Sequence, residues 1–242
     1  MKRFENQCAL VTGAAGGIGR AIVNQLRAGG ATIAASDREG TELDADVCLP
    51  GDLTEKNYCD SLCQQAYDAM GQLDILINNA GVITRGPVTT ATDDDLKLSL
   101  AVNVEAPFRL CRAAIPLMKN GGAIVNTASC WGVRPGPDHA LYCMTKAAIA
   151  SLTQCMGRDH AHQNIRVNAV CPNEVDTPML RTGFEMRGFN PDTAIAELGK
   201  TVPLGRVATP EDIANVVCFL ASSESSYMCG SLIEVNGGKP VS

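Results

Sequence analysis

The stretch QCALVTGAAGGIG, residues 7–19, decides the predicted fold, because it joins a short apolar run to a cluster of glycines. Residues 7–12 have the length and apolar character of a buried parallel strand. A helix is expected next, since Ile18, Ile22 and Leu26 recur at helical spacing and two glycines end the pattern. The stretch therefore predicts a strand, a tight turn and a helix, which together form the first unit of an α/β fold.

The alternation of strand and helix continues to the end of the chain. Further strands are predicted at 31–36, 46–49, 73–77, 123–127, 165–170 and 232–235, with helices at 54–70, at 94–119 and around Tyr142. Such alternation is typical of a parallel sheet with helices on both faces and right-handed crossovers. We therefore expect one domain, residues 1–242, with a doubly wound three-layer α/β/α architecture whose ligands lie beyond the carboxyl ends of the strands.

The bulk composition is that of an ordinary globular protein and argues against several function classes. The net charge is −6 and the sequence pI is about 5.1, so the chain lacks the basic footprint of a nucleic-acid or anionic-membrane binder. No apolar run is long enough to span a bilayer, and the first ten residues lack the apolar stretch of a secretory signal. We expect a cytoplasmic protein without nucleic-acid or membrane partners.

The sequence contains 11 cysteines, scattered through the predicted strands and helices. Their odd number and their distribution over a chain of this size favour reduced thiols that pack as small apolar side chains. Cys59 and Cys63 share one predicted helix face, but no second Cys/His pair with zinc-site spacing accompanies them. We expect structural packing there and no metal site.

The glycines between the first strand and the first helix predict a site for a dinucleotide. At Gly13, Gly17 and Gly19 the missing side chains allow a tight turn and a close approach to a pyrophosphate, and the helix N-terminus adds free N–H donors. Asp37 ends the second strand eighteen residues after Gly19, where a carboxylate can accept hydrogen bonds from the adenosine ribose. A mere tight turn is the alternative reading of the glycines.

Tyr142 and Lys146 are four residues apart, and Ser129 precedes the tyrosine by thirteen residues. On a helix, side chains at i and i+4 share one face, so the Lys146 ammonium is expected to stand beside the Tyr142 phenol. A neighbouring cation favours the phenolate and should lower the pKa of the tyrosine. The three residues therefore predict an active site in which a tyrosine transfers a proton.

These elements occur in the order typical of one enzyme family. TGxxxGxG lies at 12–19, NNAG at 78–81, and the serine and the YxxxK pair follow. The arrangement resembles the short-chain dehydrogenase/reductase family over nearly the whole chain. The resemblance implies a Rossmann-type sheet of about seven strands, a nicotinamide cofactor, and catalysis by Ser129, Tyr142 and Lys146. It adds Asn103 as a fourth catalytic residue that supports a proton-relaying water. A surface or kink residue within a helix is the alternative for Asn103.

The resemblance also implies a set of cofactor contacts. Asp37 would repel a 2′-phosphate, and Gly16 stands where NADP-using relatives often carry a basic residue, so NAD is favoured over NADP. Arg38 argues the other way, because an arginine beside Asp37 can reach a phosphate. Asp52 is also open to a simpler reading, as a capping carboxylate before Thr54. The implied cofactor contacts are Gly13, Gly16, Gly17, Ile18, Gly19, Asp37, Arg38, Asp52, Leu53, Asn79, Ala80, Gly81, Tyr142, Lys146, Pro172, Asn173, Val175 and Thr177.

The chain departs from the family where the substrate is expected. Asn173-Glu174 follows Pro172 where relatives usually have glycine. Residues 176–200 interrupt the alternation and predict a substrate lid, with a packed helical insertion as the alternative. Polar side chains on the surrounding loops predict a small polar substrate, such as a polyol, a sugar acid or another anionic hydroxy compound, unless they are solvated surface charges. The candidate substrate contacts are Arg134, His139, Asn173, Glu174 and Arg181, with Arg85 and Trp131 also near the site.

The leading hypothesis is therefore a reversible NAD-dependent dehydrogenase of secondary alcohols. The alternatives are an NADP-dependent ketone reductase, a non-catalytic NAD(H)-sensing module, and an epimerase or dehydratase that keeps its cofactor. Intact Ser129, Tyr142 and Lys146 argue against the sensor, and the short chain after the last strand argues against the last alternative. By analogy with the family, the partner is a small alcohol or ketone and the assembly a homotetramer or homodimer.

Overall fold

The computed structural model describes residues 2–239, and its single sheet contains seven parallel strands in the order β3-β2-β1-β4-β5-β6-β7. The strand order reverses between β1 and β4, which is where doubly wound sheets bind ligands. The predicted parallel Rossmann-type sheet is therefore confirmed. The strands are β1 (Cys8–Thr12), β2 (Thr32–Ser36), β3 (Val47–Cys48), β4 (Ile75–Asn78), β5 (Gly122–Thr127), β6 (Ile165–Pro172) and β7 (Leu232–Val235).

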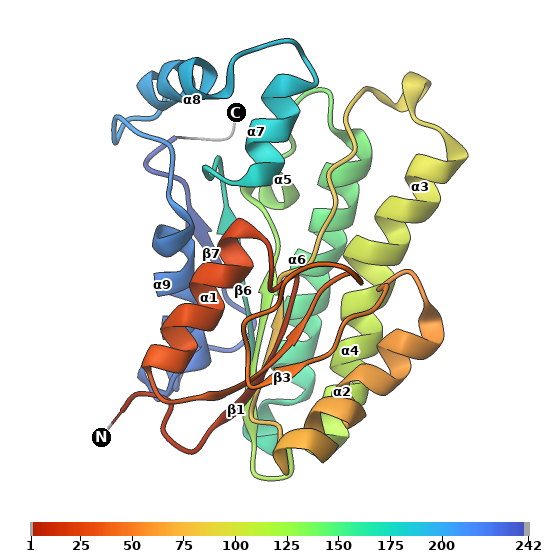
Figure 1. Cartoon of the computed structure of the whole chain (residues 1–242), viewed down its shortest axis with the longest axis vertical. Coiled ribbons are helices and arrows are strands. Elements are labelled where there is room, and N and C mark those ends of the chain that lie inside the picture. The colour runs from red at the N-terminus through yellow and green to blue at the C-terminus, as the bar shows by residue number, and fades with distance from the viewer. Residues whose placement is uncertain (1, 240–242) are drawn as a thin grey trace.

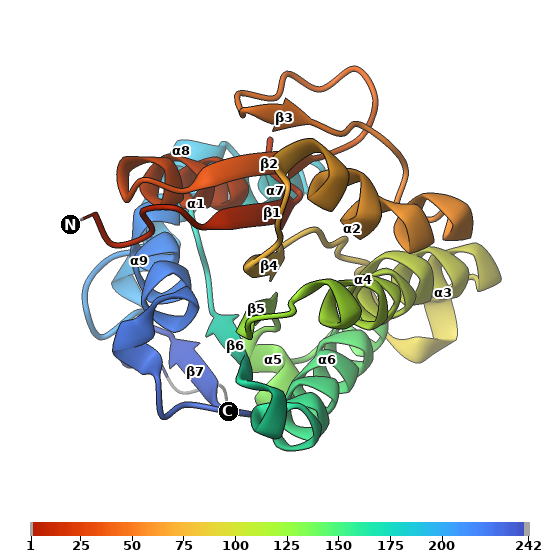
Figure 2. The ribbon, with the colours of Figure 1, turned by 90° about the horizontal axis from the view of Figure 1, so that it is seen from below.

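Helices cover both faces of this sheet (Figures 1 and 2). The first face carries α1 (Gly17–Ala28) and α9 (Pro210–Ala221), which pack on one another. The opposite face carries α2 (Lys56–Met70), α4 (Ala106–Ala114) and α6 (Ala140–Asp159). The predicted three-layer arrangement is present.

The two cores follow from the alternation of side chains along the strands. In β1, Ala9 and Val11 are buried against Ile22 of α1, whereas Leu10 belongs to the opposite core with Leu62 of α2. Because successive strand residues point to opposite faces, a strand covered on both sides must be apolar throughout. Fully burying one such large side chain stabilises the fold by roughly 1.5–3 kcal/mol. The strands thereby hold a rigid edge on which the loops of the site are mounted.

The helix predicted at 94–119 is interrupted, which the periodicity does not show. It consists of α3 (Asp93–Leu100), a π-helical turn (Ala101–Glu105), α4 and a 3-10 turn (Ile115–Leu117). A π-turn widens the helix locally and is frequent at functional sites. Here it contains Asn103, whose buried side chain bonds to the loop after β4. Tertiary hydrogen bonds therefore account for the break.

β3 has only two residues where a strand over 46–49 was expected. The carboxylate of Asp46 accepts a hydrogen bond from the backbone N–H of Ile33 at 2.8 Å. A side chain thus takes the place of the backbone partner that a longer β3 would offer to β2.

Residues 176–200 are mostly helical, with α7 (Pro178–Glu185) and α8 (Pro191–Lys200). The side chains of Thr177 and Asn190 accept hydrogen bonds at the two N-termini, and a proline follows each of them. Figure 1 shows both helices at the carboxyl end of the sheet. The segment that interrupts the alternation is therefore a helical pair placed above the site.

The apolar pattern above does not include α9 or the short α5 (Cys130–Val133). For α9, the sequence does contain a signal, because Thr209 and Asp212 form a capping box around Pro210. For α5, four residues are too few for a periodicity argument. Its start is fixed by Ser129, whose hydroxyl accepts a hydrogen bond from the N–H of Trp131.

Eight of the thiols are buried as predicted for small apolar side chains, whereas Cys48, Cys155 and Cys229 are exposed to solvent. Cys59 and Cys63 are buried on the inner face of α2, and Cys111 is buried beside them in the same layer. Burial raises the pKa of the Cys111 thiol to about 12, so it stays protonated at neutral pH. Within residues 2–239, none of the helices has both the length and the apolar character needed to cross a bilayer.

Candidate active site

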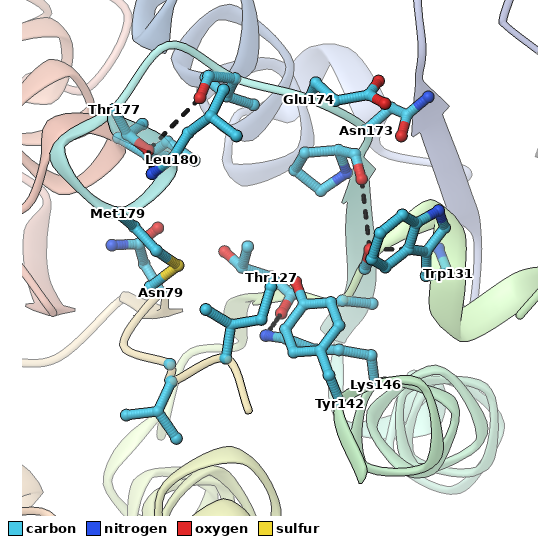
Figure 3. Close-up of a pocket in the computed structure, with 18 of the residues that line it drawn as sticks. Asn79, Thr127, Trp131, Tyr142, Lys146, Asn173, Glu174, Thr177, Met179 and Leu180 are labelled. Carbon is cyan, nitrogen blue, oxygen red and sulfur yellow. Dashed lines mark hydrogen bonds between the residues drawn. The ribbon is translucent and has the colours of Figure 1, made fainter. Parts of the chain in front are cut away.

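A cavity of about 190 Å³ lies where the loops after β4, β5 and β6 meet α6 and α7. Figure 3 shows Tyr142, Lys146 and Thr127 on one side of it and Thr177, Met179 and Leu180 across from them. The lining residues are Ile18, Asn79, Gly81, Val82, Ile83, Arg85, Thr127, Ala128, Ser129, Trp131, Tyr142, Lys146, Pro172, Asn173, Glu174, Val175, Thr177, Met179 and Leu180. The cavity therefore joins Ser129, Tyr142 and Lys146 to part of the predicted cofactor set.

The glycine loop after β1 is built so closely that side chains would not fit. Gly13 has a φ of 63°, and a Cβ atom there would lie 2.8 Å from the Cα of Ala80. At Gly19 a Cβ would lie only 2.0 Å from the carbonyl oxygen of Gly13. The loop leads into the N-terminus of α1, where backbone N–H groups and the helix dipole favour an anion. These features fit the pyrophosphate of a dinucleotide, which such a loop would hold.

Gly19→Ala should therefore weaken cofactor binding and the fold together. Moving the backbone to accept the methyl group costs about 1–3 kcal/mol, so we expect at least a tenfold loss of NADH affinity (order of magnitude) and a lower Tm. Fluorescence titration with NADH and thermal unfolding measure the two effects. Gly157→Ala is the control for a loss of stability alone, because a Cβ there would lie 2.3 Å from the backbone nitrogen of Gly230, outside the expected cofactor contacts. An unchanged NADH affinity in Gly19→Ala would contradict the assignment of the loop.

Asp37 follows β2 and is tied to the glycine loop. Its carboxylate accepts hydrogen bonds from the N–H of Ala15 at 2.9 Å and of Arg38 at 2.8 Å. The carboxylate is therefore fixed beside the loop, with lone pairs left for further donors. The side chain of Arg38 is exposed to solvent. Gly16 lies on the exposed part of the glycine loop and has no side chain there. The negative group stands beside the loop, as expected for a ribose contact.

The predicted contacts after β3 and β4 have different surroundings. Asp52 is exposed and accepts a hydrogen bond from the N–H of Thr54 at 2.8 Å, whereas the N-cap of α2 is Glu55. Its carboxylate thus closes a turn ahead of the helix, and Leu53 packs against the core. The Asn79 amide donates to the carbonyl oxygen of Gly13 at 3.1 Å. The loop after β4 therefore supports the glycine loop, and Gly81 and Asn79 reach the cavity.

Ser129, Tyr142 and Lys146 meet in this cavity, although they come from two different segments. Ser129 follows β5, and the other two lie one turn apart on α6. The Lys146 Nζ donates to the carbonyl oxygen of Thr127 at 2.7 Å and lies 5.8 Å from the centre of the Tyr142 ring. The tyrosine packs edge-on against Trp131, at 6.3 Å between ring centres. The predicted helix face is present, and its two polar groups point to the same cavity (Figure 3).

The electrostatic effect expected from this pair is not present in the structure. Burial raises the pKa of Tyr142 to about 12, and a hydrogen bond from Ser129 acts in the lowering direction. Burial also lowers the pKa of Lys146 to about 8, because the residue is only 4% exposed. The ammonium donates to the Thr127 carbonyl, and burial sets the direction in which the pKa of the phenol is shifted. The expectation that Lys146 lowers the pKa of Tyr142 is therefore corrected.

Asn103 is buried next to the site but does not line the cavity. Its amide oxygen accepts from the N–H of Val82 at 2.8 Å, and its amide nitrogen donates to the Val82 carbonyl at 2.9 Å and to Thr145 at 3.1 Å. Each polar atom of its side chain therefore has a protein partner, and the amide oxygen keeps a second lone pair for a further donor. Gly81 lies between Asn103 and Lys146, which are both 3.3 Å from the position of a Cβ there.

Three of the expected substrate contacts lie outside the cavity and are bound to other groups. Arg134 forms an ion pair with Glu234 on β7. Arg181 pairs with Asp176 at 2.7 Å and with Asp192 at 2.7 Å, and joins α7 to α8. His139 precedes α6, bonds to the Pro137 carbonyl at 2.8 Å and packs on Trp131. Their charges or ring atoms are engaged within the fold, and none of the three lines the cavity. Sequence proximity to Tyr142 suggested Arg134 and His139, whereas Arg181 was expected on a loop at the rim of the cleft.

Other residues take their place at the cavity. Asn173 and Glu174 line it as predicted, and the Glu174 carboxylate also pairs with Lys239 at 2.7 Å. Arg85 is the arginine that lines it. Four apolar residues that were not predicted complete the wall: Val82, Ile83, Met179 and Leu180. Their only signal in the sequence was position, next to NNAG and within the predicted lid.

Comparisons with known proteins agree with this geometry. The family described as enoyl-(acyl carrier protein) reductase matches residues 13–239. The chain is 33% identical over 249 residues to 3-oxoacyl-(acyl-carrier-protein) reductase of Thermotoga maritima, with 98% of each chain covered. It is 32% identical over 250 residues to meso-2,3-butanediol dehydrogenase of Serratia marcescens, covering 99% of this chain and 97% of that one.

A solved structure is similar over the same length. Ligand-free aldohexose dehydrogenase of Thermoplasma acidophilum matches with a TM-score of 0.94 and 27% sequence identity, covering 100% of this chain and 96% of that chain. The order of motifs, the strand order and these relatives lead to one assignment. The chain is an oxidoreductase that belongs to the short-chain dehydrogenase/reductase family.

Proposed function

We propose that this protein is an NAD-dependent dehydrogenase that oxidises a small secondary alcohol and reduces the corresponding ketone. The observation that carries the proposal is the meeting of Ser129, Tyr142 and Lys146 in one cavity, which continues toward the glycine loop through Asn79 and Ile18. A loop that fits a dinucleotide and a proton-transfer group thus share one cleft. Dehydrogenation needs both, because a hydride and a proton leave the alcohol together.

Each residue has a distinct role in this proposal. When bound, NAD supplies the hydride acceptor. Ser129 donates a hydrogen bond that orients the substrate oxygen, and Tyr142 takes the hydroxyl proton. Lys146 holds the ribose hydroxyls and places positive charge beside the tyrosine. Asn103 is a positioning residue, because its hydrogen bonds fix Val82 and with it the loop after β4.

The cavity supports a small substrate, with residues 176–200 as its lid. Its volume of about 190 Å³ is below the range of roughly 300–1,000 Å³ of pockets for drug-sized ligands. Thr177, Met179 and Leu180 lie at the start of the helical pair and form one wall. Closure of that wall would exclude water from the reaction. We keep a single domain, residues 1–242, as part of the proposal.

The choice of NAD over NADP rests on Asp37. Asp37→Ser should raise kcat/KM for NADP about tenfold and lower it for NAD, because the carboxylate that repels a 2′-phosphate is gone. Arg38 then becomes available to the phosphate. The measurement is initial rates with both cofactors. Asp44→Ser is a matched control, since Asp44 is a surface acid paired with Arg27; an equal change in both variants would contradict the role of Asp37.

One assay separates the candidate functions. Absorbance at 340 nm records net NADH formation from a panel of secondary alcohols, with NAD and NADP tested separately. NADH formation supports the dehydrogenase; activity with NADP alone would favour the ketone reductase instead. Binding of NADH without turnover of any alcohol or ketone would favour a sensing module. A homotetramer or homodimer in the cytoplasm stays a prediction, and light scattering measures the assembly.

A further inference from the structure

Only one of the charged side chains that line the cavity has an ion-pair partner among the described residues. Three charged residues line it: Arg85, Lys146 and Glu174. The Glu174 carboxylate pairs with Lys239 at 2.7 Å, in a contact where both side chains are largely buried. The Lys146 ammonium is bound to the carbonyl oxygen of Thr127. Among the described residues neither Lys146 nor Arg85 has a carboxylate partner, and of these two cations Arg85 is the one that donates no side-chain hydrogen bond.

Arg85 reaches the lid from the loop after β4. Its guanidinium packs directly on α7, because a Cβ atom on Gly183 would lie 2.3 Å from one of its terminal nitrogens. Gly183 is buried under this contact. Any larger residue at 183 would displace the guanidinium, so the glycine leaves room for Arg85 at the border between cavity and lid.

A second cation contacts the same glycine. The Arg187 Nε donates to the carbonyl oxygen of Gly183 at 2.8 Å, and its guanidinium lies over the rings of Phe184 and Phe189 at 4.7 and 5.9 Å. These contacts orient the group without neutralising it. Burial lowers the pKa of Arg85, and the charge of Arg187 adds to that effect. The two like charges thus destabilise one another.

Two other arginines near the site are compensated by carboxylates. Arg134 and Arg181, which also lie on loops or helices near the site, both form ion pairs with carboxylates. Among residues 2–239, neither Arg85 nor Arg187 forms one. An anion placed between them would relieve their repulsion and join the cavity to the lid.

We propose that Arg85 binds the carboxylate of a small hydroxycarboxylate substrate, with Arg187 supplying a second positive charge from the lid. The planar guanidinium can donate two parallel hydrogen bonds to a carboxylate, which fixes both position and orientation. The inference rests on the proposed dehydrogenase function and narrows its substrate class to hydroxy acids. Neutral polyols lack the group that Arg85 recognises.

Matched substrate pairs test the proposal. Lactate with 1,2-propanediol, 3-hydroxybutyrate with 1,3-butanediol, and gluconate with sorbitol each differ at the carboxylate alone. In whichever pair the wild type turns over, kcat/KM should be higher for the hydroxy acid than for the neutral alcohol. In Arg85→Met it should fall about 30-fold for the acid and less than about threefold for the alcohol. Equal losses for both, or a preference for the neutral alcohol in the wild type, would overturn the assignment.

Two further variants separate recognition from structure. Arg85→Lys keeps the charge but loses the planar fork, so it should restore part of the acid activity. Arg134→Gln removes a nearby arginine that is already paired with Glu234, and should leave the acid-to-alcohol ratio unchanged. An acid-specific loss in Arg134→Gln equal to that of Arg85→Met would show a general charge effect and count against the site.

A binding measurement keeps the test independent of turnover. Calorimetric titration of oxalate into the enzyme with NADH should show binding to the wild type and at least tenfold weaker binding to Arg85→Met (order of magnitude). NADH affinity should be the same in both proteins. Equal oxalate affinities would refute the anion site even if no substrate is found. A failure of the wild type to bind NADH would instead refute the proposed dehydrogenase function.

Discussion

Tyr142→Phe is expected to lower kcat by about a thousandfold, because general acid–base catalysis typically contributes 10²–10⁴. The phenylalanine ring should keep the packing against Trp131, so only the hydroxyl is lost. NADH affinity should change less than about threefold, since the ribose contact is assigned to Lys146. Steady-state rates and fluorescence titration with NADH measure the two quantities. Retention of more than a few per cent of kcat would show that another group transfers the proton.

The same assignment predicts the pH dependence. Burial raises the pKa of Tyr142 to about 12, so the phenol is protonated at neutral pH and must lose a proton before it can accept one. The rate of alcohol oxidation should therefore increase as pH rises from about 7 to about 10, whereas the rate of ketone reduction should not increase. In Tyr142→Phe this difference should disappear. An oxidation rate that falls over this range would contradict the tyrosine as the base.

Lys146→Met should reduce kcat about a hundredfold and weaken NADH binding about tenfold, because the variant loses both the cation beside Tyr142 and the proposed ribose contact. Methionine has a similar length and an apolar stem, so the packing of α6 should be retained. Rates and NADH titration again give the two values. An unchanged NADH affinity would contradict the ribose contact of Lys146. The loss of kcat would still test its effect on proton transfer.

The same variant is expected to be more stable than the wild type at neutral pH. Burial lowers the pKa of Lys146 from 10.5 to about 8, a shift that corresponds to about 3 kcal/mol of unfavourable burial of the charge. Below pH 8 the lysine is charged in both the folded and the unfolded chain, so the folded state bears the whole cost. Between pH 8 and 10.5 the folded protein binds fewer protons than the unfolded one, so its stability rises with pH.

Thermal unfolding of both proteins without cofactor checks this linkage. At about pH 7 the Tm of Lys146→Met should exceed that of the wild type by several degrees, and this difference should shrink as pH approaches about 10. The lost hydrogen bond to Thr127 offsets the gain by about 1 kcal/mol. A Tm below that of the wild type at pH 7 would mean that the ammonium stabilises its surroundings. A higher Tm would show that the buried Lys146 ammonium lowers the stability of the fold.

The site was only partly predictable from the sequence. The spacing of Tyr142 and Lys146 and the glycines at 13–19 are local patterns, so one helix face and one loop could be derived from them. The positions of Arg134 and Arg181 were not derivable in this way, because their ion-pair partners are distant in the sequence or in a segment without periodicity. The same holds for Asn103, whose π-turn depends on contacts with Val82 and Thr145.

By itself, the sequence determined the order of strands and helices and the cluster of motifs at the carboxyl edge of the sheet. Both depend on periodicity and on spacing within short segments, which are set by backbone geometry. Only the tertiary structure decided which charges are neutralised, how deeply Lys146 is buried, and that Arg85 meets α7 at Gly183. Those properties depend on distances between remote residues and on exclusion of water, which no local pattern encodes.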